Sequence, residues 1–264
     1  MSATATRSRF IGAARELLAR VEEQEPSLQR AAEICAEAIG AGGLVHAFGT
    51  GHSRIAVEEL FPRYGSYPGF HPMAELSMTF HTQVVGVNGQ RQAMFIERVE
   101  GLAEQILENF ELSPPDAMLV FSAGGSTAVP IEMAAGARRR GLPVIAVTAA
   151  QAEPPLIDHA DVVLDLCTPR GDAMVQVEGV DTPIGPGSTI AAAALANELK
   201  VRTAEALLAK GALPPVITSS AVVGPGRSAE LFDGAYAEHA RRIARVLRGA
   251  VPNTEEEEDG SPDQ

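Results

Sequence analysis

The stretch LVHAFGTGHS (Leu44–Ser53) decides the fold class of this chain. Its first five residues form an apolar run of strand length, and its last five form a turn rich in glycine and hydroxyl groups. A segment with helical spacing follows. A second stretch of the same kind, AMLVFSAGGST (Ala117–Thr127), precedes another helical segment. Strands that alternate with helices in this way predict a parallel sheet with helices on both faces.

Both turns have the composition of an anion-binding site. Glycine lets the backbone approach a ligand closely, and the N–H groups at the positive end of the next helix face that ligand. Because parallel strands end at the same edge of a sheet, the two turns together predict one phosphorylated ligand at that edge. For each turn taken alone, the alternative interpretation is a helix cap or a glycine-rich connection that binds no ligand. The candidate ligand-binding residues are Gly49, Thr50, Gly51, Ser53, Ser122, Gly124, Gly125, Ser126 and Thr127.

The remaining pattern extends the alternation of strands and helices. Helices are expected over residues 10–21, 25–40, 54–61, 90–109, 129–140, 188–210 and 229–247, strands over 144–147, 162–166 and 174–177, and loops over 64–72, 183–186 and 214–225. We predict one doubly wound, flavodoxin-like α/β domain over residues 1–250, with an N-terminal helical arm and C-terminal helices. The arm packs either on its own domain or on a partner subunit. Residues 251–264 read as a disordered acidic tail.

Charge and composition limit the classes of partner. The chain has 264 residues and a net charge of −13, and it keeps about −7 without the six acidic residues of its tail. An acidic chain is a poor match for nucleic acid, which needs a basic surface. No apolar run reaches the ~18 residues that a membrane span requires. The two cysteines form no disulfide framework. We therefore expect a cytoplasmic protein without a nucleic-acid or membrane partner.

Acidic side chains near the turns are candidates for proton transfer. Glu59 lies shortly after the first turn, and Glu178 ends a strand-like run ahead of a third small-residue turn that contains Ser188. A carboxylate beside a sugar phosphate can remove a proton next to a carbonyl. Arg63 could orient Glu59 or bind ligand oxygens. The alternatives are a solvated helix face for Glu59 and a helix cap for Ser188. The histidines have no zinc-site spacing, so we expect no metal and no cofactor.

The chain resembles the sugar isomerase (SIS) domain family in GTGHS, in Glu58-Glu59 behind it, and in the turn Ser122–Thr127. The resemblance implies a doubly wound parallel sheet, a homodimer or homotetramer, and binding of a phosphorylated sugar. Val57–Leu60 with Arg63 also resembles phosphoheptose isomerases, which implies Glu59 as acid/base and Ser122 and Thr127 as phosphate ligands. Where those isomerases hold zinc with a histidine, this chain has Ile55. Where they have the middle serine of the second turn, it has Gly124.

Further motifs resemble N-acetylglucosamine-6-phosphate dehydratases within that family. They are ERVEG (Glu97–Gly101), PIEMA (Pro130–Ala134) and a VEG turn ahead of GPGST (Gly185–Thr189). This resemblance implies loss of water across C2–C3 of the open-chain sugar. We expect Glu59 and Glu178 to share the base and acid roles and His52 to polarise the carbonyl or the leaving oxygen. The alternatives are an aldose–ketose phosphosugar isomerase and a non-catalytic phosphosugar-sensing module.

Overall fold

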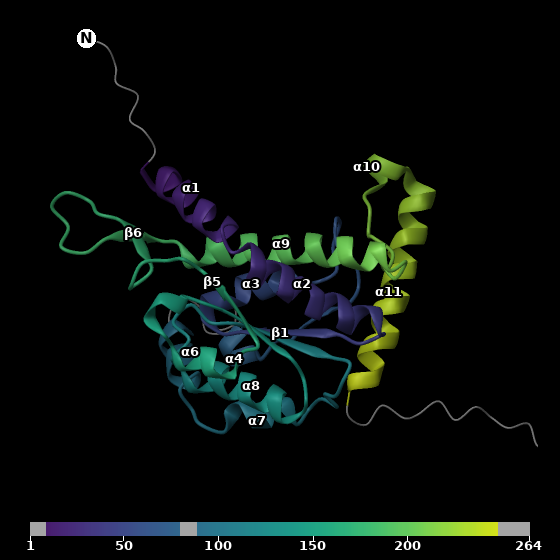
Figure 1. Ribbon diagram of the computed structural model, residues 1–264, viewed down its shortest axis with the longest axis horizontal. Coiled ribbons are helices and arrows are strands. Elements are labelled where there is room, and N and C mark those ends of the chain that lie inside the picture. Colours follow the sequence, from purple (N-terminus) through teal and green to yellow (C-terminus); the bar gives the residue numbers. More distant parts are fainter. Residues whose placement is uncertain (1–8, 80–88, 248–264) are drawn as a thin grey trace, which may run out of the picture.

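Five parallel strands form the central sheet of the computed structural model, which describes residues 9–79 and 89–247 (Figure 1). The strand order is β2-β1-β3-β4-β5. The strands are β1 (Val45–Gly49), β2 (Phe70–Pro72), β3 (Ala117–Phe121), β4 (Val144–Thr148) and β5 (Val162–Asp165). The order reverses direction between β1 and β3, as in other doubly wound folds. The predicted fold class is confirmed.

Helices cover both faces of the sheet (Figure 1). One layer contains α1 (Arg9–Glu22), α2 (Glu25–Gly40), α3 (Arg54–Glu58) and α9 (Ser188–Ala209), and the other contains α4 (Leu76–Thr79), α6 (Gly89–Ile96), α7 (Leu102–Leu107) and α8 (Ala128–Arg139). The short 3₁₀ helices are η1 (Gly51–Ser53), η3 (Ala150–Ala152) and η4 (Pro155–His159), and the chain continues through α10 (Ser220–Val223) and α11 (Pro225–Val246). None of these described helices is long and apolar enough to cross a membrane.

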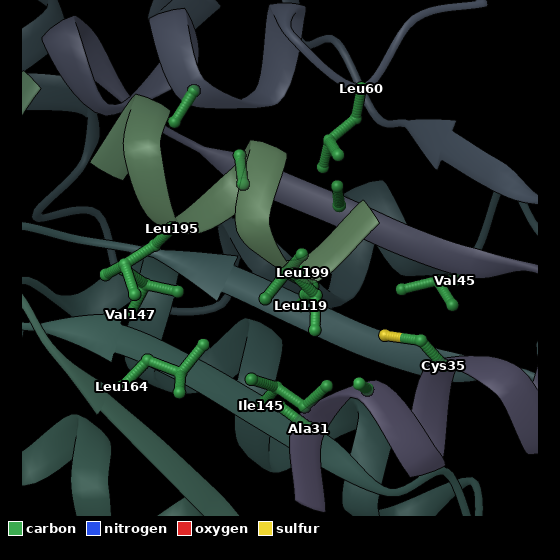
Figure 2. Packing of buried hydrophobic residues seen from close by; sticks show 14 of the residues in the cluster. Ala31, Cys35, Val45, Leu60, Leu119, Ile145, Val147, Leu164, Leu195 and Leu199 are labelled. Carbon is green, nitrogen blue, oxygen red and sulfur yellow. The ribbon is translucent and has the colours of Figure 1, made fainter. Parts of the chain in front are cut away.

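The sheet supplies side chains to two separate cores. Every residue of β1, β3 and β4 is buried, which explains their continuous apolar sequences. Figure 2 shows the first core, where Leu119, Ile145, Val147 and Leu164 from the strands meet Leu195 and Leu199 of α9 and Ala31 and Cys35 of α2. Helix α2 is therefore part of the domain's own layer. Helix α1 follows it there, because Leu17 and Val21 join the same core.

Two predicted elements in the first half of the chain differ from the structure. The segment 64–72, predicted as a loop, ends in the edge strand β2, where Pro72 is tolerated because one side of an edge strand makes no ladder hydrogen bonds. The single helix predicted over 90–109 is two helices, since Gly101 adopts a left-handed φ of 83° between them. Phe95 and Val99 in this segment are exposed, at 71% and 40% respectively.

A second correction concerns the segments 174–177 and 183–186. They pair with each other as the antiparallel hairpin of β6 (Ala173–Val175) and β7 (Ile184–Pro186), outside the parallel sheet. Residues 183–186 are therefore not only loop. In Figure 1 the hairpin projects from the body beside α1, and the Arg9 guanidinium donates a hydrogen bond to the Gln176 carbonyl. The predicted loop 214–225 likewise contains the short helix α10.

Helix α11 holds the starting ends of the central strands. Arg242 Nη1 donates hydrogen bonds to the carbonyl oxygens of Ile39 (2.9 Å) and Gly43 (2.6 Å). Arg245 pairs with Asp116, whose Oδ1 also accepts the N–H of Leu44 at 2.9 Å. Leu44 precedes β1 and Asp116 precedes β3, so one carboxylate connects the last helix to both strands.

The buried His46 and the half-buried His71 lie next to this carboxylate. His46 on β1 and His71 on β2 face each other with their Nδ1 atoms 2.8 Å apart, and His46 Nε2 lies 3.3 Å from Asp116 Oδ2. Burial, and then the neighbouring His46, lowers the pKa of His71 to about 3. Burial opposes ionisation of Asp116, but hydrogen bonds from His46, Leu44 and Arg245 hold its pKa below the ordinary value.

This cluster predicts a loss of stability in weak acid. The unfolded chain binds a proton on His71 near its ordinary pKa of 6.5, whereas the folded chain does not do so until about pH 3. The free energy of unfolding should therefore fall as the pH drops from 6.5 to 4.5, by at most about 1.4 kcal/mol per pH unit for this histidine. Urea titrations should show a smaller fall for His71→Gln. An equal fall in both proteins would contradict the assignment.

Candidate functional site

The two turns predicted to bind an anion face one cavity. In the β1–β3 register Gly49 lies opposite Phe121, so the turns that follow begin at the same level. The first leads to η1 and α3 on one face of the sheet, and the second leads to α8 on the other. Between them lies a cavity of about 400 Å³. A crevice at the point where strand connections diverge is the usual ligand site of an open α/β sheet.

The first turn is held close to its helix. A side chain on Gly49 would place its Cβ 3.0 Å from the backbone of Ser53, so the residue must be small. Gly51 adopts a left-handed φ of 54°. Thr50 is buried, and its Oγ1 donates a 2.7 Å hydrogen bond to Glu97 Oε2. His52 is exposed and forms part of the cavity wall.

The second turn is fixed by its own hydrogen bonds. Gly125 has a φ of 57°, and a Cβ there would lie 2.7 Å from Thr148 Oγ1 and 2.8 Å from Pro154 Cβ. Its N–H donates to Ser122 Oγ at 3.2 Å, while Ser126 Oγ donates to the Gly124 carbonyl at 2.8 Å. Thr127 is the N-cap residue of α8, and its side chain makes no capping bond. In the first turn of α8 the Val129 N–H is taken by the Glu97 carbonyl and Pro130 has no N–H, so the Ala128 N–H is the donor left for an external anion.

Helix α6 forms a third wall. Glu97, at the end of this helix, lines the cavity, and its backbone carbonyl accepts the N–H of Val129 at 3.0 Å. Gln90, near the start of the helix, also lines the cavity. Its Oε1 is buried and has no hydrogen-bond partner among the described residues. The wall therefore offers one carboxylate and one unpaired amide oxygen.

The fourth wall is the start of α9. Asp172 Oδ1 accepts the N–H groups of Gly187 (3.0 Å) and Ser188 (2.7 Å). Its Oδ2 accepts the Ser188 hydroxyl at 2.6 Å. Asp172 has a left-handed φ of 71°, and its N–H bonds to the carbonyl of Pro169 at 2.8 Å. A protein carboxylate thus already occupies the positive end of α9.

Most of the predicted ligand residues line this cavity. They are Thr50, Gly51, His52, Ser53, Ser122, Gly124, Gly125, Ser126, Thr127 and Ser188. Gly49 ends β1 just before them. Their contact with a ligand remains a prediction. Ser188 carries an internal partner, since its hydroxyl is bonded to Asp172.

The predicted site residues Glu59, Arg63 and Glu178 do not line the cavity. Glu59 follows α3, with both carboxylate oxygens 3.3 Å from Arg63 Nη1. Its backbone carbonyl accepts a 2.9 Å hydrogen bond from the buried Lys200 Nζ, which completes the end of that helix. Glu178 is exposed in the turn between β6 and β7. The catalytic roles predicted for Glu59 and Glu178 therefore find no support in the cavity of a single chain.

Sequence reasoning missed the cavity residues Glu97, Gln90 and Asp172. Glu97 was quoted only as part of a family motif, and no spacing relates α6 to either turn. The glycine at position 101, which precedes α7 and separates it from α6, was the available signal of a break near Glu97. Asp172 lies on a loop, and nothing in its sequence neighbourhood predicts that it caps a helix fifteen residues later.

The cavity wall carries little positive charge. Among the described residues that line it there is no lysine or arginine, and His52 is the only basic side chain. Two arginines that follow the first turn in sequence pair with glutamates: Arg54 with Glu58 at 2.6 Å and Arg63 with Glu59. In the part of the chain that the structure describes, no three histidine, cysteine or acidic side chains gather as a metal site.

Comparison with known proteins identifies the family. The SIS domain pattern matches residues 9–149. The chain is 35% identical to a UPF0309 protein of Streptomyces coelicolor over 81% of this chain and 88% of that one. It is 29% identical to a UPF0309 protein of Geobacillus kaustophilus over 88% and 90%. The fold matches a phosphoheptose isomerase of Francisella tularensis with a TM-score of 0.52 at 14% identity, covering 78% and 100%. The chain therefore belongs to the SIS domain family.

Proposed function

We propose that this protein is a phosphosugar lyase that dehydrates an N-acetylated hexosamine 6-phosphate, with N-acetylglucosamine 6-phosphate as the substrate. The observation that carries the proposal is the meeting of both hydroxyl-rich turns and the Glu97 carboxylate around one cavity. Membership of the SIS family and the motifs ERVEG and GPGST support the same reading. As an enzyme it would act without a metal or cofactor.

The phosphate is assigned to the second turn. The α8 N-terminus lacks a side-chain cap, and Ser126 and Thr127 bring hydroxyl groups to it. Helix dipoles and backbone N–H groups bind phosphate without a cationic side chain. This fits a wall that contains no lysine or arginine among its described residues.

The base is assigned to Glu97. In the open-chain sugar, Glu97 takes the C2 proton, and the electron pair of the C–H bond forms the C1–C2 enolate. The C3–O bond then breaks, the leaving oxygen takes a proton from His52, and water departs. The product has a C2=C3 double bond conjugated with the C1 aldehyde. The hydroxyl of Thr50 holds the Glu97 carboxylate in place.

Two considerations favour dehydration over isomerisation. An enolate with an acetamido group at C2 has no C2 hydroxyl from which a ketose can form, so loss of the C3 hydroxyl is the open route. The buried Gln90 Oε1, unpaired among the described residues, is an acceptor that an acetamido N–H would satisfy. An isomerase would instead require a sugar with a hydroxyl at C2, from which an enediol can form.

The central test follows product mass. Purified protein is incubated with N-acetylglucosamine 6-phosphate and, in parallel, with fructose 6-phosphate and sedoheptulose 7-phosphate, and products are followed by mass spectrometry and proton NMR. We expect the loss of one water from the acetylated sugar alone. Unchanged mass with a new NMR spectrum would establish an isomerase. Binding of all sugars without turnover would establish a sensing module, and either result would overturn the proposal.

Substitution of the candidate base gives a second prediction. Glu97→Gln keeps an acceptor for Thr50 but removes the base, so turnover should fall by about 10²–10⁴-fold with little change in substrate affinity. Glu59→Gln and Glu178→Gln serve as matched controls and should retain near-normal turnover, measured in the same assay. If Glu97→Gln keeps its turnover while Glu59→Gln or Glu178→Gln loses most of it, the base is one of the glutamates predicted from the sequence and not Glu97.

The phosphate turn gives a third prediction. Gly125→Ala forces a side chain against Thr148 and Pro154, so the free energy of unfolding should fall by about 2–4 kcal/mol. Displacement of this turn should remove a charge-assisted hydrogen bond to the phosphate, so affinity for the sugar phosphate should fall by at least about tenfold. The matched control Gly211→Ala has a similar φ of 65° but nothing within 4 Å of its Cβ. Calorimetry that gave equal sugar-phosphate affinities for the two variants would contradict the assignment.

A further inference from the structure

The cavity receives the N-termini of two long helices. Ser126 and Thr127 lie at the start of α8, and Ser188 and Thr189 lie in the first turn of α9. Each terminus carries a partial positive charge and N–H groups that a ligand anion could use. A sugar phosphate entering this cavity therefore meets two possible anchors, and a productive complex requires that only one of them bind phosphate.

Asp172 makes the two termini unequal. Its carboxylate accepts two backbone N–H groups and one hydroxyl at the start of α9, at distances of 2.6 to 3.0 Å. The α8 terminus has no side-chain cap. The N–H groups of Gly187 and Ser188 are therefore already taken, and the start of α9 carries a carboxylate charge that would repel a second anion.

The backbone conformation of the loop before α9 places the Asp172 carboxylate at the start of that helix. Gly171 and Asp172 have left-handed φ angles of 83° and 71°, and the Gly187 N–H also lies 3.1 Å from the backbone carbonyl of Asp172. Left-handed backbone is uncommon for a residue other than glycine. A serine at the first turn of α9 could have capped the helix without any charge, so the acidic side chain adds something beyond helix termination.

We propose that Asp172 is a specificity-determining residue that confines the phosphate to α8 and excludes ligands with a second anionic group. The inference rests on the proposed function and narrows it: the substrate is a sugar with one phosphate and no other negative charge. Repulsion from Asp172 would act against bisphosphates, sugar acids and carboxylate-bearing ethers. Because Glu97 lies on the same cavity, a second anion would meet a carboxylate in two of its walls.

The test uses two open-chain probes that differ by one charge, glucitol 6-phosphate and 6-phosphogluconate. Calorimetry of the wild-type protein should show clear preference for glucitol 6-phosphate. Asp172→Asn keeps an acceptor for the α9 N–H groups and tolerates the left-handed backbone. It should reduce that preference on the order of tenfold, as expected for removing a unit charge ~6–7 Å away at an effective dielectric near 40.

The matched control is Asp161→Asn at the other edge of the sheet. Asp161 accepts the N–H of Val144 at 2.8 Å and pairs with Arg138 at 2.9 Å, so the control removes the same charge from a similar setting. It should leave the preference unchanged. If Asp172→Asn fails to fold, Asp172→Gly suits the left-handed backbone and should show the same shift in preference.

Three outcomes are distinguishable. A reduced preference in Asp172→Asn, with Asp161→Asn like the wild type, supports the proposal. An unchanged preference, or equal weakening of both probes, overturns it and leaves Asp172 as a helix cap alone. If the wild type binds neither these probes nor N-acetylglucosamine 6-phosphate, the proposed function fails, and that result is separate from any effect of Asp172.

Discussion

The parallel pairing of β1 with β3 is the constraint on which the site depends. Gly49 lies opposite Phe121, so two segments 70 residues apart in sequence finish their strands at one level. Helix α11 fixes the other ends of the same strands through Asp116, Leu44 and Arg245. In the first core, shown in Figure 2, α2 and α9 pack against the sheet. The cavity lies where the connections from β1 and β3 turn to opposite faces.

An acidic protein that binds an anion must separate its own charges from the ligand. This chain has a net charge of −13, and its cavity wall has no lysine or arginine among the described residues. Arg54 and Arg63, which follow the first turn, are engaged with Glu58 and Glu59. Backbone N–H groups, hydroxyls and the α8 dipole are the available anion ligands. Such a site is selective because its donors are fixed in direction by the fold.

The two carboxylates on the cavity are placed for different tasks. Glu97 is held by one hydroxyl, from Thr50, which leaves its other oxygen available. Asp172 has both oxygens engaged by the start of α9. The same side-chain chemistry therefore serves as a candidate base in one wall and as a fixed negative charge in another. Glu97 and Asp172 therefore differ in how many of their carboxylate oxygens accept hydrogen bonds.

Much of the architecture could be predicted from local sequence. The apolar runs before GTGHS and SAGGST identified β1 and β3, because fully buried strands carry continuous apolar residues. The glycines and hydroxyls of both turns identified most of the cavity floor. The edge strand β2 was missed because its pairing partner β1 lies outside a local window. The break at Gly101 and the hairpin of β6 and β7 were missed although their residues are close together in the chain.

The sequence by itself determined the fold class, the two turns and the kind of ligand that such turns bind, since each follows from residues adjacent in the chain. Only the tertiary structure decided which acids reach the cavity. Glu59, close in sequence to the first turn, pairs with Arg63 outside it, whereas Glu97 and Asp172 arrive from a different helix and a loop. Proximity to a ligand depends on how helices pack across the sheet, and that packing is set by contacts between residues far apart in the chain.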